Sequence, residues 1–91
     1  MTDITTQFLQ TVVLKAARIL FVREAEGFEA ALTLWNELDR ETAGSRKDLP
    51  THIFDLIIQV EFLMEGDPMV DMSEAQHALY VAKSELHRKG C

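Results

Sequence analysis

The sequence predicts an all-α protein, a small antiparallel bundle of about four helices that dimerisation completes. Residues 53–64 and 8–22 carry apolar side chains at helical spacing, and these side chains cover more than one face of each helix. Strict alternation of apolar and polar residues, which is typical of a half-buried strand, is almost absent. The connections between the helical segments are short, and short connections favour antiparallel neighbours.

The first helix is expected at residues 4–24, with Asp3 as its N-cap. Gly27 then interrupts the pattern, because a glycine inside a helix costs about 1 kcal/mol relative to alanine. The second helix is expected at residues 28–42, with apolar side chains on one face and charged ones on the other. Residues 42–48 are rich in small and charged side chains, so we expect a loop there.

The third helix is expected at residues 50–65, because Gly66 provides a typical helix end. The fourth helix is expected at residues 72–89. Asp71 and Glu74 have the spacing of a capping box, in which the two side chains satisfy backbone N–H groups reciprocally.

Length and charge restrict the class of protein. The 91 residues suffice for a single domain, 1–91, and the net charge is −6 from fifteen acidic and nine basic side chains. This charge repels nucleic acid and anionic lipid, so we expect neither as a partner. Lys15 and Arg18 interrupt the first apolar stretch, which argues against a secretory signal or a membrane span and favours a cytoplasmic protein. Cys91 is the single cysteine, so an internal disulfide is excluded.

No motif predicts a catalytic, cofactor or metal site. Glu61 and Glu65 are four residues apart on the third helix, but no second helix repeats the carboxylate pattern that a magnesium–phosphate site requires. We expect both carboxylates to be solvated at the helix edge. No two histidines are four residues apart on one helix, as a zinc-binding pair would be. We therefore expect a non-enzymatic protein without a cofactor.

Three methionines surround the turn between the third and fourth helices. Met64, Met69 and Met72 have flexible, polarizable side chains, which fill gaps in cores and also form adaptable surfaces for partner helices. Core packing is the favoured interpretation, and a partner surface is the alternative.

Residues 27–35 resemble the second half of a tetratricopeptide unit, with Ala31 and Trp35 at the small and aromatic positions. The resemblance covers nine residues. The preceding segment lacks the glycine and tyrosine pattern of that family, and no second unit follows on which the first would stack. We therefore interpret this region as two packed helices that are joined at a glycine.

The apolar excess of the first and third helices predicts association. Four short helices do not readily enclose two helices that are apolar over more than half their circumference, and a large exposed apolar patch marks an interface. A symmetric dimer covers such a patch with one surface per copy, and a standard interface buries about 800 Å² per partner. The residues expected between core and interface are Phe8, Val12, Ile19, Phe21, Phe54 and Phe62.

Two classes of function follow. The leading hypothesis is a non-enzymatic protein-interaction module, a homodimeric helical adaptor or regulator that binds another protein. A small acidic inhibitor is one form of it, because an acidic surface is steered to a basic target. The alternative is a small-ligand-binding or metal-dependent helical enzyme with a site between helices or at the dimer seam.

Overall fold

The computed structural model describes residues 6–66 and 72–90, with side chains up to residue 88, and within these ranges the ordered elements are all helical. The prediction of an all-α bundle of about four helices is confirmed. In chain order the elements are α1 (Thr6–Ala25), α2 (Phe28–Thr42), the short 3-10 helix η1 (Arg46–Asp48), α3 (Thr51–Met64) and α4 (Met72–Gly90).

The described helix ends lie close to their expected positions, within one residue for every end except the start of α1. Residues 4 and 5, where the first helix was expected to begin, lie outside the described residues. The same is true of the two expected capping residues, Asp3 and Asp71, and of Met69 and Cys91. Residues 46–48 form one turn of 3-10 helix within the segment that was expected to be a loop.

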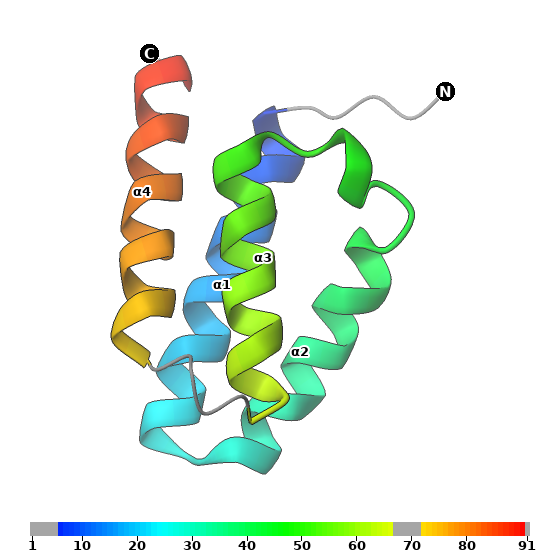
Figure 1. Cartoon of the computed structure of the whole chain (residues 1–91), viewed down its shortest axis with the longest axis vertical. Helices are drawn as coiled ribbons and strands as arrows, with labels where there is room; N and C mark the ends of the chain where they lie inside the picture. The colour runs from blue at the N-terminus through cyan, green and yellow to red at the C-terminus, as the bar shows by residue number, and fades with distance from the viewer. Residues whose placement is uncertain (1–5, 67–71, 91) are drawn as a thin grey trace.

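Successive helices run in alternating directions, as Figure 1 shows. α1 packs against α2 and α4, and α3 packs against α4 and α2. α1 and α3 lie on a diagonal of the bundle and also contact each other, with α1 behind α3 in the view of Figure 1. Each of these two helices therefore has neighbours on three sides and one side that faces outward.

The core lies between the four helices, and α3 contributes its centre. Ile53, Leu56, Ile57 and Val60 of α3 are fully buried, as is Ile19 of α1. A helix needs a broad apolar stripe to pack on a core, and the apolar residues of α3 cover this stripe and continue beyond it. The excess of apolar residues in α3 therefore remains available on its outward side.

Gly27 separates α1 from α2, as predicted. Its φ of 109° lies in a region that is open to glycine and strained for other residues. The backbone N–H groups of Glu26 and Gly27 both donate to the carbonyl of Val22, at 2.7 and 3.1 Å. These bonds satisfy the end of α1 and turn the chain directly into α2.

Thr42 is the last residue of α2 and lies inside the bundle. Its side chain is buried, and its hydroxyl donates a hydrogen bond of 2.9 Å to the carbonyl oxygen of Leu38. A buried hydroxyl needs such a partner, because leaving it without one costs about 1–3 kcal/mol. The threonine therefore fits inside the core at the point where the chain leaves α2 for η1.

Candidate interaction surfaces

The outward side of α1 exposes large apolar side chains. Leu14 and Phe21 are seven residues apart on α1, so they lie on one helix face, and their exposed fractions are 67% and 69%. Tyr80 of α4 is 68% exposed. Phe21 and Tyr80 line a groove of about 410 Å³ between α1 and α4. We call the surface of Leu14, Phe21 and Tyr80 the α1–α4 face.

The charges at the α1–α4 face are mixed. Glu24 of α1 and Lys83 of α4 both line the groove, together with apolar side chains that include Leu20 and Leu79. One carboxylate and one ammonium group therefore border the same apolar surface.

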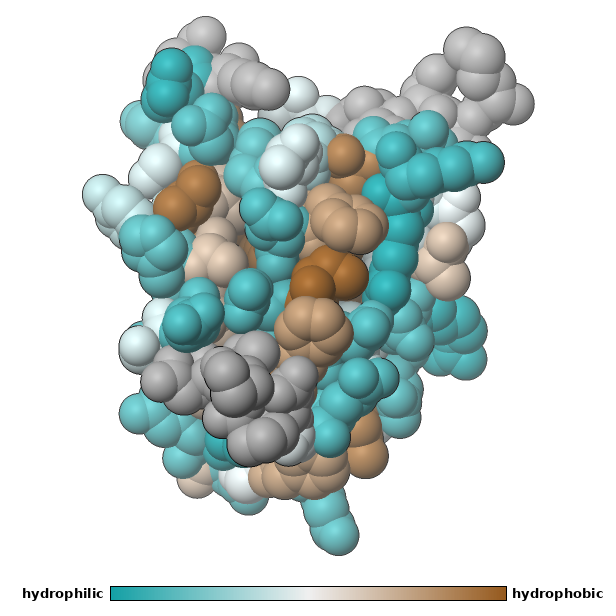
Figure 2. Space-filling view, viewed as in Figure 1, coloured by the Kyte–Doolittle hydropathy of each residue, from teal (hydrophilic) through white to brown (hydrophobic). Residues whose placement is uncertain are grey.

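The outward side of α3 carries a second apolar surface. Phe54, Ile58 and Phe62 follow one another at intervals of four residues, which places them along one side of the helix. Phe54 is 37% exposed, and Ile58 and Phe62 are half-buried. Figure 2 shows an apolar strip that runs down the molecule over α3, with hydrophilic residues on both sides. We call these three residues the α3 strip.

A groove of about 810 Å³ runs between α3 and α4 beside the α3 strip. Asp55 of α3 and Glu74 and Glu85 of α4 line it, and the described residues that line it include no lysine or arginine. The histidines His52 and His77 also line the groove. We call it the acidic groove, because its formal charges are negative when the histidines are neutral.

The carboxylate of Glu85 at the acidic groove has a cationic neighbour. Glu85 accepts a hydrogen bond of 3.2 Å from Arg88, one turn further along α4. The Arg88 side chain is 75% exposed, so this pair contributes little and the groove keeps a negative balance.

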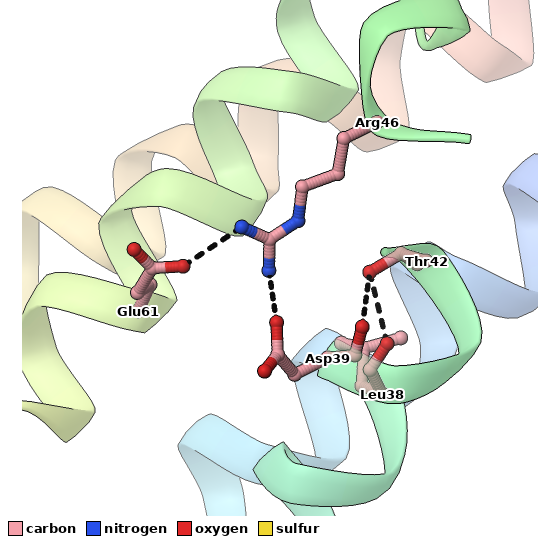
Figure 3. A network of polar contacts seen from close by, with 5 residues as sticks. All are labelled: Leu38, Asp39, Thr42, Arg46 and Glu61. Carbon is pink, nitrogen blue, oxygen red and sulfur yellow. Dashed lines mark hydrogen bonds and ion pairs between the residues drawn. The ribbon is translucent and has the colours of Figure 1, made fainter. Parts of the chain in front are cut away.

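The opposite edge of the α3 strip is closed by an ion-pair network around Arg46 of η1 (Figure 3). Its guanidinium group donates to Glu61 of α3 at 2.9 Å and to Asp39 of α2. It also lies 5.9 Å from the ring centroid of Trp35, within the range of a cation–π contact. Arg46 therefore ties η1 to both flanking helices.

This network corrects one expectation about the carboxylates of α3. Glu61 is only partly solvated, because its side chain is 23% exposed and accepts a hydrogen bond from Arg46. Glu65 is exposed, as expected. The partner of Glu61 lies fifteen residues away in the sequence, so no local spacing indicated it.

The six residues that were expected between core and interface separate into four groups. Val12 and Ile19 belong to the core, since they are 2% and 0% exposed, and we leave them out of any proposed surface. Phe8 is half-buried and packs against the core. Phe21 belongs to the α1–α4 face, and Phe54 and Phe62 belong to the α3 strip.

Three residues of the two surfaces were not among the expected ones. Leu14 and Ile58 are part of apolar runs, so their type gave no indication of which way they point. Tyr80 is a single tyrosine on a polar helix, and its exposure follows from the position of α4 in the bundle.

Among the methionines, Met64 is buried and Met72 is half-buried against the core. Both positions agree with the core interpretation rather than with a partner surface. In the described part of the chain no group of three or more His, Cys, Asp or Glu side chains is arranged to hold a metal ion. None of the helices in that part has the length and apolar character needed to cross a bilayer.

The α1–α4 face and the α3 strip lie on different sides of the bundle, because α1 and α3 occupy diagonal positions. No family model, no curated protein and no solved structure matches this chain.

Proposed function

We propose that this chain is a non-enzymatic protein-interaction module, an adaptor or regulator that forms a symmetric homodimer through the α1–α4 face. The observation that carries the proposal is the exposure of this face. Leu14, Phe21 and Tyr80 are the most exposed large apolar side chains of the described residues. Scattered apolar residues are normal on a protein surface, but Phe21 and Tyr80 line one groove, and Leu14 lies seven residues before Phe21 on the same face of α1.

The exposed area supports an interface at this face. A fully buried Phe or Tyr removes about 150–250 Å² from water, so Phe21 and Tyr80 together expose roughly 270 Å². Leu14 extends this patch along α1, toward the size that typically marks an interface. A standard interface of about 800 Å² per partner is about one seventh of the 5856 Å² surface of the chain. The apolar residues would form its centre and the charged residues its rim.

The charges at the face favour a second copy as the occupant. A two-fold axis brings the same surface of both copies together, so like charges meet unless the surface carries both signs. The α1–α4 face carries both, because Glu24 and Lys83 line its groove. Lys83 of one copy can therefore approach Glu24 of the other. The acidic groove between α3 and α4 lacks this balance.

The separation of the two apolar surfaces favours self-association through one of them. If both surfaces paired with copies of themselves, each molecule would bind two others on different sides, and the assembly would close only where the two-fold axes meet as in a D2 tetramer. One self-associating face gives a closed dimer. The α3 strip is then left for a different partner.

The test is a comparison of matched aspartate variants by light scattering after size-exclusion chromatography at several concentrations. We expect a dimer for the unaltered chain, a monomer for Phe21→Asp and a dimer for Phe54→Asp, which alters the other surface. Both residues are exposed, so both variants should retain the helical circular dichroism of the parent. A monomeric parent at high micromolar concentration would contradict the proposal, and so would a dimer that Phe54→Asp dissociates and Phe21→Asp does not.

A further inference from the structure

We infer that the α3 strip and the acidic groove beside it together bind a basic amphipathic helix of another protein. This inference rests on the proposed function, since it names the class of partner that the module binds. It adds the surface, the chemistry of the partner and the orientation in which the partner lies.

The spacing of the α3 strip fits a helical partner. Phe54 and Phe62 are eight residues apart, so the strip extends for about 12 Å along α3, a little over two helical turns. An amphipathic helix presents its own apolar residues at intervals of three and four positions over a similar distance. A linear apolar strip between polar margins is therefore the counterpart of the apolar face of such a helix.

The charge beside the strip determines the sign of the partner. Asp55, Glu74 and Glu85 line the groove, and no lysine or arginine stands among the described lining residues. Val81 also lines the groove and is exposed at its surface, so the floor can accept the methylene stem of a lysine while the carboxylates receive its ammonium group. The net charge of −6 steers a basic partner toward the molecule over a longer range.

The two edges of the strip differ, and this difference sets the orientation of the partner. On the α2 side, the guanidinium group of Arg46 pairs with both Glu61 and Asp39, so it offsets part of their negative charge. On the α4 side, the acidic groove remains negative. A partner helix whose basic residues follow only one flank of its apolar face matches this arrangement, with the basic flank over the groove.

The same charges disfavour the other occupants. A second copy of this chain would bring the same carboxylates to the interface, so a symmetric contact would set acidic groove against acidic groove. Nucleic acid and anionic lipid carry the same sign as the groove and are repelled as well.

The experiment measures the binding of fluorescent 18-residue peptides to the full chain by fluorescence anisotropy. The probe is a helical Leu/Lys peptide with leucines on one face. Its controls are a Leu/Glu peptide with the same apolar pattern and a scrambled Leu/Lys peptide without a helical face. We expect at least about tenfold tighter binding of the amphipathic basic peptide than of either control, and an affinity that falls as salt rises.

Variants assign the binding to this surface. The triple variant Asp55→Asn/Glu74→Gln/Glu85→Gln replaces the three carboxylates by uncharged amides and leaves the core unchanged. It should weaken binding by about tenfold or more. Phe54→Ser should weaken it as well, because it removes an exposed part of the strip. Phe21→Ser, on the α1–α4 face, is the matched control and should leave the affinity within about twofold.

Equal binding of the basic, acidic and scrambled peptides would overturn the inference, and so would a triple variant that binds as well as the parent. A loss of binding in Phe21→Ser but not in Phe54→Ser would place the site on the wrong face and overturn it too. Light scattering on the same samples separates this inference from the dimer. A dimer that binds no peptide overturns the helix-binding surface alone, and a monomer that binds the basic peptide overturns the dimer alone.

Discussion

Replacement of Arg46 by methionine tests how firmly η1 holds α2 and α3 together. The change retains a side chain of similar length but removes the hydrogen bonds to Glu61 and Asp39 and the contact with Trp35. A hydrogen bond to a charged group contributes about 1.5–3 kcal/mol, whereas an exposed ion pair contributes about 0.2–1 kcal/mol. Arg46 and Glu61 are each 23% exposed and Asp39 is 47% exposed, so they lie between these limits.

From these limits we expect Arg46→Met to lower the free energy of unfolding by about 2 kcal/mol. In a domain of this size, 1 kcal/mol corresponds to about 4–8 °C, so the melting temperature should fall by on the order of 10 °C. Thermal unfolding followed by circular dichroism measures both quantities. Parent and variant are compared at equal concentration, so that self-association affects the stability of both in the same way.

The matched control is Arg88→Met, which removes an arginine whose side chain is 75% exposed and pairs with Glu85 on the same helix. Such a pair contributes about 0.3–0.5 kcal/mol, so the melting temperature should change by no more than about 4 °C. A double-mutant cycle of Arg46→Met with Glu61→Gln should show a coupling of about 1 kcal/mol. Equal losses for the two arginine variants would refute the view that Arg46 holds η1 in place.

Two further predictions concern the backbone and the alternative function. Gly27→Ala should destabilise the chain by about 1 kcal/mol, because a φ of 109° strains any L side chain even where no atom lies within 4 Å of the added Cβ. Gly44→Ala is the control. Its Cβ meets no atom either and its φ is not in that region, so the stability should stay unchanged or rise slightly. Denaturant titration of both variants measures this difference, and equal midpoints would contradict it. Millimolar Mg²⁺ should leave the melting temperature unchanged, because no group of carboxylates or histidines in the described residues is arranged to hold the ion. A rise that increases with Mg²⁺ concentration would instead favour the metal-dependent enzyme, since a ligand of the native state stabilises it.

The helices of the fold could be predicted from local patterns, because each depends on residues that are close in the sequence. Gly27 ends α1 through its own backbone conformation, and Gly66, with a φ of 79°, follows the end of α3 in the same way. Helical spacing identified the segments that pack, and the short connections favoured the antiparallel order that Figure 1 shows.

The outward faces could not be predicted in the same way. On α1, Val12 and Ile19 are seven residues apart, and so are Leu14 and Phe21, so two lines of large apolar residues run along one helix. The structure buries the first line and exposes the second. Both lines satisfy the same helical period, and only the positions of the neighbouring helices distinguish them.

The acidic groove and the Arg46 network could not be predicted from the sequence for a related reason. The groove combines Asp55 of α3 with Glu74 and Glu85 of α4, and each of these is an ordinary surface carboxylate within its own helix. Their common location follows from the pairing of two helices. Arg46 likewise stood in a segment rich in small and charged residues, and its role depends on the approach of α3 to η1.

The diagonal placement of α1 and α3 has a consequence for avidity. A dimer joined at the α1–α4 face would carry two copies of the α3 strip away from its seam, so neither copy would obstruct the other. Such a dimer would be bivalent, and a target that offers two suitable helices would be held by both, with the second engagement favoured by a high effective concentration. Two separate targets would instead be brought together on one small scaffold.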